Sequence, residues 1–250
     1  MRKLIVIFSL ILAFGLPAIA QNKSFKRAND LYSKGEYKNA AIEYETILKN
    51  QGVSPELYYN LGNAYYKMGE VAKSILNYER ALRLQPTYED AKTNLEMAQL
   101  KVVDNVVQIP PFFVMRWIDG LMKLLTSNQW LVLSLLFWLV TLTSILLFIF
   151  GKTLTYRKTS FYMAIVFVGF TFFSGIFSGV RKHQMVNHSE AIILSGAVYI
   201  KSAPDKSGTD LFLLHEGTKV KIKSTLDKWV EVVIGNGNVG WIENNCIEKI

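Results

Sequence analysis

Side chains suited to catalysis or metal binding are few and scattered in this 250-residue chain. The only histidines are His183, His188 and His215, and the only cysteine is Cys246. None of these histidines has a second ligand at a spacing typical of a metal site. Cys246 lies among apolar residues near a turn and has no evident base partner. We therefore expect no catalytic residue, no metal and no cofactor, and predict that the protein is not an enzyme.

The positive charge of the chain, +8 at pH 7, would suit a nucleic-acid-binding protein if it were gathered on a soluble face. Residues 21–110 carry 12 basic and 11 acidic side chains, and residues 184–250 carry 7 and 8. Residues 111–183 instead carry 7 basic side chains against 1 acidic one. Basic residues beside membrane spans set topology. We therefore expect no nucleic-acid partner.

Side chains suited to protein recognition recur in residues 22–105, where the sequence resembles itself at an offset of 34 residues. Gly35 aligns with Gly69, and Tyr44 aligns with Tyr78. The second unit is the more complete and carries Tyr58, Leu61, Gly62, Tyr65, Ser74, Tyr78, Ala81 and Pro86. This pattern resembles the tetratricopeptide repeat. The resemblance implies an all-α helical repeat domain over residues 22–105, with two repeats and a capping helix.

Such a stack presents a groove lined by the first helix of each repeat. The residues expected there are Phe25, Asn29, Tyr32, Tyr59, Asn63, Tyr66, Thr93 and Met97. Asn29 and Asn60 match the variety of the family that clamps a carboxylate, but Asp90 and Asn94 occupy the positions of its basic residues. We therefore predict that the groove binds an extended or helical peptide rather than an acidic C-terminus. The alternative is that this face is only the exposed surface of a spacer.

Two uncharged apolar runs, Leu131–Phe150 and Phe161–Val180, are each long enough to cross a bilayer as a helix. We place transmembrane helices at residues 130–150 and 161–181, with a short loop, Gly151–Thr159, between them. Because that loop is short, the spans are antiparallel and the domains on either side of the hairpin share one side of the membrane. Neither run contains Asp, Glu, Lys, Arg or His, so we expect no transport pathway.

Glycines in the second span provide a surface for close helix packing. Gly175 and Gly179 form a pair of small residues four positions apart, which lets another helix approach closely. That helix is either the first span or a helix of a partner protein.

The N-terminal residues 1–20 fit a secretory signal peptide. Arg2 and Lys3 precede the apolar run Leu4–Leu16, and Ala18-Ile19-Ala20 has the small residues of a cleavage site. We predict cleavage after Ala20, with an uncleaved anchor as the alternative. Export of the following residues would place both soluble domains in the periplasm of a bacterium, at its inner membrane, and the short loop in the cytoplasm.

Residues 111–126 predict an amphipathic helix that lies in the membrane interface. Arg116, Asp119 and Lys123 share one helical face, and apolar side chains occupy the rest. Trp117 and Trp130 would lie at the depth of the lipid headgroups, which aromatic side chains prefer.

Residues 188–250 predict a small all-β domain, because short alternating runs are separated by turn residues. The segments His215-Glu216-Gly217-Thr218-Lys219-Val220 and Val239-Gly240-Trp241-Ile242, together with Trp229, resemble the bacterial SH3-like domain. The resemblance implies a small barrel that binds either protein or cell-wall peptide. Trp229 and Trp241 are a candidate ligand face, and a place in the barrel core is the alternative.

The order of these segments resembles the BatE-type proteins of the Bat aerotolerance operon. The predicted fold is multi-domain, with an all-α tetratricopeptide repeat, a two-helix transmembrane hairpin and a small all-β SH3-like barrel. The resemblance implies a scaffold in a membrane complex with other Bat proteins that carry von Willebrand factor A domains. The expected partners are therefore membrane proteins and the lipid bilayer. The alternative is a cell-wall module that binds peptidoglycan.

Overall fold

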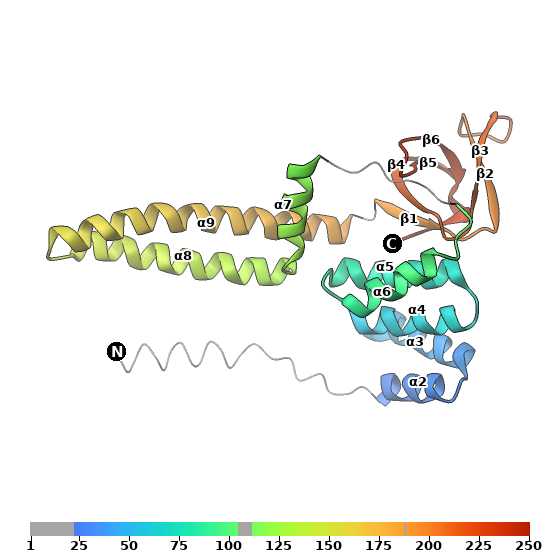
Figure 1. Ribbon diagram of the computed structural model, residues 1–250, viewed down its shortest axis with the longest axis horizontal. Helices are drawn as coiled ribbons and strands as arrows, with labels where there is room; N and C mark the ends of the chain where they lie inside the picture. Colours follow the sequence, from blue (N-terminus) through green and yellow to red (C-terminus); the bar gives the residue numbers. More distant parts are fainter. Residues whose placement is uncertain (1–22, 105–111, 188) are drawn as a thin grey trace.

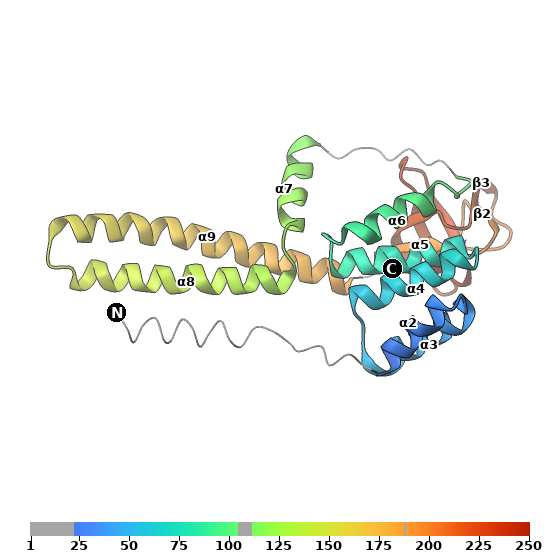
Figure 2. The same cartoon turned by 60° about the horizontal axis from the view of Figure 1, so that its bottom comes forward.

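The computed structural model describes residues 23–104, 112–187 and 189–250 (Figure 1). The predicted signal peptide, residues 1–20, lies outside the described residues. A stack of short helices, a long helical hairpin and a β domain follow one another along the chain. The stack and the β domain lie together at one end of the hairpin, as two views show (Figures 1 and 2).

The described part of the stack contains α2 (Lys23–Ser33), α3 (Tyr37–Gln51), α4 (Pro55–Lys67), α5 (Val71–Leu84) and α6 (Glu89–Gln99). Gly35 and Gly69 end the first helix of each repeat, and both have a φ of +81°, a conformation that glycine adopts without steric cost. Small residues allow the helices to approach closely. A Cβ atom on Gly62 of α4 would lie 2.7 Å from the ring of Tyr78 on α5. The residues that predicted a helical repeat therefore form its packing contacts.

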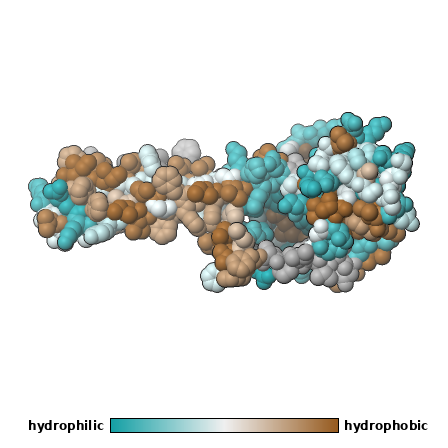
Figure 3. Space-filling model, turned by 90° about the horizontal axis from the view of Figure 1, so that it is seen from above, coloured by the Kyte–Doolittle hydropathy of each residue, from teal (hydrophilic) through white to brown (hydrophobic). Residues whose placement is uncertain are grey.

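The hairpin consists of α8 (Ser127–Phe150) and α9 (Leu154–Val186), which are long and apolar enough to be candidate membrane spans. Most of their large apolar side chains are exposed, as a lipid-facing surface requires and a soluble core helix does not. Figure 3 shows this surface as mainly hydrophobic, in contrast to the adjacent domains. The helices include the predicted spans but are longer. The connection between the helices is Gly151–Thr153, which is shorter than the predicted loop. The Thr153 side chain caps α9, so the basic residues Arg157 and Lys158 lie inside that helix.

Helix α7 (Phe113–Lys123) lies within the segment predicted to be interfacial and runs across the hairpin at its domain end (Figure 1). The indole nitrogen of Trp130 on α8 donates to the main-chain oxygen of Met122 on α7 at 3.0 Å. Trp117 is 82% exposed on the opposite surface of α7. An aromatic side chain so placed is typical of a helix at the membrane–water boundary.

The β domain contains strands β1 (Glu190–Ile193), β2 (Ala197–Lys201), β3 (Asp210–His215), β4 (Lys219–Leu226), β5 (Trp229–Val233), β6 (Val239–Glu243) and β7 (Ile247–Lys249). All pairs are antiparallel, in the order β3-β2-β6-β5-β4-β1-β7. Alternating inward residues such as Ile200, Val230 and Ile242 form the buried core.

The β domain is of the predicted SH3-like type, and its seven-stranded antiparallel sheet is open. Strands β3 and β7 are the two edges, and no pairing joins them among the described residues. Register shifts at Ile200/Lys201 in β2 and at Ile222/Ser224 in β4 break the regular strand pairing, and such bulges bend a sheet. The edge strand β7 and its neighbour β1 contact α5 of the helical stack instead of β3.

Candidate protein-binding groove

The groove of the helical stack contains a side-chain network that begins at Asn29 on α2. The Asn29 Oδ1 atom accepts a hydrogen bond from the Tyr44 hydroxyl at 2.6 Å and a longer one from Asn60 Nδ2 at 3.3 Å. These three side chains, with Tyr32 and Asn63, line a pocket of about 230 Å³. Burial raises the pKa of the Tyr44 phenol, so the hydroxyl remains a protonated donor even in alkaline solution.

The same network is repeated one tetratricopeptide unit later. The Asn63 Oδ1 atom accepts from the Tyr78 hydroxyl at 2.7 Å and from Asn94 Nδ2 at 2.8 Å. We call this arrangement of two asparagines and a tyrosine the Asn–Tyr module. In each module the oxygen of the first asparagine accepts both hydrogen bonds. The amide N–H groups of that asparagine donate to no other side chain or main-chain oxygen within residues 23–104. Those groups, on Asn29 and Asn63, are available donors in the groove.

The other predicted groove residues surround these modules. The ring of Phe25 packs 6.1 Å from Tyr44, and Tyr59 packs 5.0 Å from Tyr88. The Lys101 ammonium lies 4.1 Å above the ring of Tyr66. The exposed side chains on α6, the predicted capping helix, include Thr93 and Met97, and neither of them lines the pocket at Asn29.

The contribution of Asn60 and Asn94 to these modules was not predicted from the sequence, in which Asn60 was noted only as a match to the carboxylate clamp and Asn94 only as a replacement for one of its basic residues. The self-comparison at 34 residues could have identified them. It aligns Asn29 with Asn63, Asn60 with Asn94, and Tyr44 with Tyr78.

The glycine pair of the second span is divided between two environments. Gly175 faces α8, where a Cβ atom would lie 3.5 Å from Ser134 Oγ. Gly179 has no neighbour that a Cβ atom would meet within 4 Å among the described residues. Two reciprocal hydrogen bonds of 3.0 Å between Ser127 and Ser178 fix the register of the two helices nearby. Of the two partners expected for the glycines, the first span therefore accounts for Gly175.

Trp229 and Trp241 lie outside the buried core of the β domain. In β5 and β6 the inward positions belong to Val230, Val232 and Ile242, which are nearly completely buried. The strand register pairs Val230 with Ile242 and places both tryptophans on the opposite surface, where each is half-buried. Neither indole therefore belongs to the buried core cluster of this domain.

An unexpected feature is a close contact between the helical stack and the β domain. Its apolar centre is formed by Ile75 and Leu76 of α5 with Ile192 of β1 and Ile250. All four side chains are at most 3% exposed. Burial of this kind stabilises an interface by roughly 1.5–3 kcal/mol for each large apolar side chain. The two domains therefore form one unit, which we call the head.

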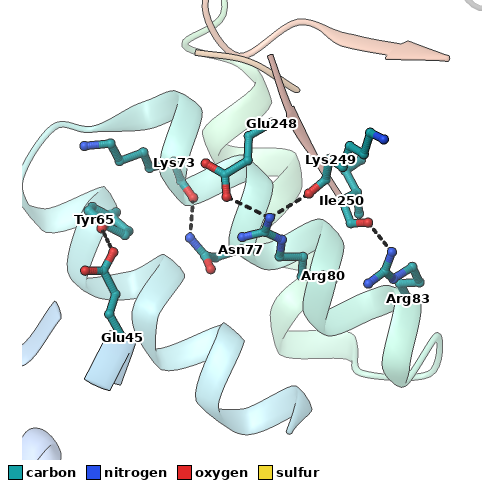
Figure 4. A network of polar contacts seen from close by, with 9 residues as sticks. All are labelled: Glu45, Tyr65, Lys73, Asn77, Arg80, Arg83, Glu248, Lys249 and Ile250. Atoms are coloured by element: carbon teal, nitrogen blue, oxygen red, sulfur yellow. Dashed lines mark hydrogen bonds and ion pairs between the residues drawn. The ribbon is translucent and has the colours of Figure 1, made fainter. Parts of the chain in front are cut away.

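Arg80 of α5 holds the edge strand β7 (Figure 4). Its Nη2 atom donates to Glu248 Oε1 at 2.8 Å and to the main-chain oxygen of Lys249 at 2.6 Å. One turn further along α5, Arg83 donates to the main-chain oxygen of Ile250. These bonds satisfy polar groups at a sheet edge that would otherwise be open to pairing with another chain.

Lys219 lies between the two domains at β4. Its ammonium lies 2.9 Å from Glu79 of α5 and 3.0 Å from Glu190 of β1. Burial alone would lower the pKa of Lys219, but the two adjacent carboxylates raise it above its ordinary value. The lysine therefore stays charged and bridges the stack to the sheet.

Asp104, which follows the capping helix, binds the turn that precedes β4. Its carboxylate accepts from the His215 amide at 2.6 Å and from the Thr218 hydroxyl at 2.7 Å, and it lies 2.8 Å from His215 Nδ1. Burial alone would raise the pKa of Asp104, but these hydrogen bonds hold it below its ordinary value. Gly217, in the same turn as His215 and Thr218, packs against Val102. A Cβ atom on this glycine would lie 2.8 Å from the Val102 side chain.

Comparison with known proteins agrees with the two soluble domains. Residues 55–88 match the tetratricopeptide repeat family, and residues 196–248 match the bacterial SH3 domain. No curated protein sequence matches the chain. The chain therefore combines a helical repeat, two long apolar helices and an SH3-like antiparallel domain. Both soluble domains are of types that suggest binding to other proteins.

Proposed function

We propose that this protein is a non-enzymatic membrane scaffold whose helical groove captures an extended segment of another protein. The repeated Asn–Tyr module supports this proposal most directly. The amides of Asn29 and Asn63 occupy equivalent positions one repeat apart, and each has N–H donors for a ligand. The main-chain carbonyls of an extended peptide are matching acceptors, so recognition would depend little on the sequence of the peptide.

The contact between the two domains supports the same function. Because α5 is bound to β1 and β7 by apolar burial and by Arg80, the groove is carried on a unit larger than the repeats alone. A groove that is ordered before binding loses less entropy when the ligand arrives. The tetratricopeptide stack is short, and the SH3-like domain buries apolar side chains of its last two helices, α5 and α6.

The membrane setting and the partner belong to the same proposal. The two candidate spans lie between a tetratricopeptide and a bacterial SH3 match, an order that supports a place among the BatE-type proteins. In this proposal the head lies in the periplasm, the hairpin crosses the inner membrane, and the partners are Bat proteins with von Willebrand factor A domains.

Asn63→Asp tests the groove with little change to the fold. A carboxylate keeps an oxygen acceptor for Tyr78 and Asn94 but removes the N–H donors offered to a ligand. Asn50→Asp is the matched control, because Asn50 is exposed near the end of α3 and outside the pocket. In crosslinked pulldowns from native membranes, Asn63→Asp should reduce partner recovery about tenfold, equivalent to about 1.4 kcal/mol. Equal recovery with both variants would refute a groove-based function.

A second function is favoured by the outward position of Trp229 and Trp241. Half-buried indoles on the outer surface of a sheet can stack on a sugar or peptide, so the SH3-like domain would bind peptidoglycan. The full chain in detergent should then sediment with purified sacculi, and Trp241→Ala should reduce the bound fraction. Absence of sedimentation by the wild-type chain would remove this function.

A further inference from the structure

A cavity of about 640 Å³ lies where the head meets the hairpin. Its walls come from α5 and α6 of the stack, from α7, from the end of α9, and from β1 and β4. Six basic and four acidic side chains line it. Two of these acidic groups, Glu79 and Glu190, are paired with Lys219, and Asp119 is paired with Lys123 at 2.6 Å. The side chains that line the cavity therefore carry an excess of two positive charges, six minus four, and this excess favours an anion.

Arg181 of α9 is the unusual side chain in this cavity. It is only 4% exposed, and its Nη1 atom donates to Gln184 Oε1 at 3.0 Å. Its Nε and Nη2 atoms are buried and have no hydrogen-bond partner in the described part of the chain. Asp119 is close enough to attract the guanidinium but forms no ion pair with it within 4.0 Å. A buried guanidinium with two unsatisfied nitrogens is costly unless a ligand completes it.

The two free nitrogens define the ligand geometry. Nε and Nη2 form one edge of the planar guanidinium, and this edge binds two oxygens of a phosphate or carboxylate side by side. Lys92 and Lys221 also line the cavity and add positive charge at its exposed edge. The site therefore suits a tetrahedral anion with several oxygens.

The position of Arg181 along α9 selects the source of that anion. Ser178 is paired with Ser127, the first residue of α8, so these two residues lie at the same level of the hairpin. Arg181 lies three residues beyond Ser178, or about 4.5 Å further along a helix axis. It therefore lies immediately outside the apolar run and beside α7, whose Asp119 and Lys123 line the same cavity. This is the depth of phospholipid headgroups.

We propose that the cavity binds the phosphodiester of an anionic phospholipid, with Arg181 as its central ligand. The acyl chains of this lipid would lie against the exposed apolar surface of α8 and α9, and the phosphate would fill the space between the hairpin and the head. Binding would fix the orientation of the head relative to the membrane. The proposal does not depend on the peptide groove, which lies on other faces of the stack.

Native mass spectrometry of the full-length protein in detergent tests this site. The lipid probe is phosphatidylglycerol, and a diacylglycerol with the same acyl chains but no phosphate is the reference. Arg181→Gln should weaken phosphatidylglycerol binding about tenfold. Lys182→Gln is the matched control, because Lys182 is the exposed neighbour, carries the same charge and does not line the cavity. It should change the affinity less than twofold.

Competition and a third variant distinguish a lipid site from a site for free anions and from a general effect of surface charge. Inorganic phosphate at millimolar concentration should not displace the lipid, and displacement would show a site for free anions and overturn the proposal. Equal weakening by Arg181→Gln and Lys182→Gln would also overturn it, because the effect would then be one of general surface charge. Lys221→Gln tests the site even if Arg181→Gln fails to fold, since Lys221 is exposed on β4. It should weaken binding two- to threefold, and wild-type affinity would contradict the proposal.

Discussion

Replacement of Asp104 by asparagine should loosen the head by weakening the contact between the capping helix and the SH3-like domain. Asp104 is 13% exposed and takes part in three close contacts with His215 and Thr218, between 2.6 and 2.8 Å. Hydrogen bonds to a charged group contribute roughly 1.5–3 kcal/mol each. Asparagine keeps one acceptor oxygen but carries no charge. Its amide N–H groups would face donors that now bind the carboxylate, the His215 amide and the Thr218 hydroxyl. We therefore expect a loss of about 2 kcal/mol in the docking free energy.

Hydrogen exchange of the full-length protein in nanodiscs measures this loss. A docking free energy lower by about 2 kcal/mol corresponds to opening that is about 30-fold more frequent. Peptides from α5, β1 and β7 should therefore exchange faster, whereas peptides from the hairpin should not change. Glu96→Gln is the control, because Glu96 is exposed on α6 and its substitution removes the same charge. If Asp104→Asn exchanges within threefold of this control, the assigned role of Asp104 is refuted.

Three further predictions concern acid sensitivity, the repeat and the hairpin. Because hydrogen bonds hold the pKa of Asp104 below its ordinary 3.8, its stabilising contribution is complete above that pH and is lost as the pH falls through the lower folded value. Exchange at the docking surface should therefore rise below about pH 4 in the wild type, and Asp104→Asn should lack this rise. Gly62→Ala should lower the free energy of unfolding of the stack by about 1–3 kcal/mol in chemical denaturation, because the new methyl group would meet the buried ring of Tyr78. An unchanged free energy of unfolding would contradict the packing described. Ser178→Ala should lower the free energy of unfolding of the hairpin by about 0.6 kcal/mol in a membrane unfolding assay, because the hydrogen bond to Ser127 is lost. A loss above about 2 kcal/mol would contradict this modest role of the hydrogen bond.

The sequence predicts the types and order of the domains because each type has a local signature. The 34-residue offset identifies the repeat, apolar runs identify the two candidate spans, and the short alternating segments identify the strands. Hydropathy defines the apolar part of a helix and not its full length. This explains why α9 begins at Leu154, before the predicted span, and takes Arg157 and Lys158 into its first turns.

The docking of the two domains could not be predicted in the same way. Arg80, Asp104 and Lys219 are ordinary charged residues in sequence, and the partners that they bind in the other domain lie more than 100 residues away. No periodic pattern links such positions, so only the folded chain shows that they meet. The cover on the edge strand β7 belongs to the same contact, because it comes from a helix of another domain. Alternation in a sequence predicts strands, but it does not show whether the sheet closes.

The central claim is that the helical repeat and the SH3-like domain form one ordered head that carries the groove. Spin labels at Lys38→Cys on α3 and Thr225→Cys on β4, both exposed positions, can test it in a Cys246→Ser chain. Double electron–electron resonance in nanodiscs should give one narrow distance distribution, and Asp104→Asn should broaden it. A broad distribution for the parent chain would show that the domains move independently and would contradict the claim.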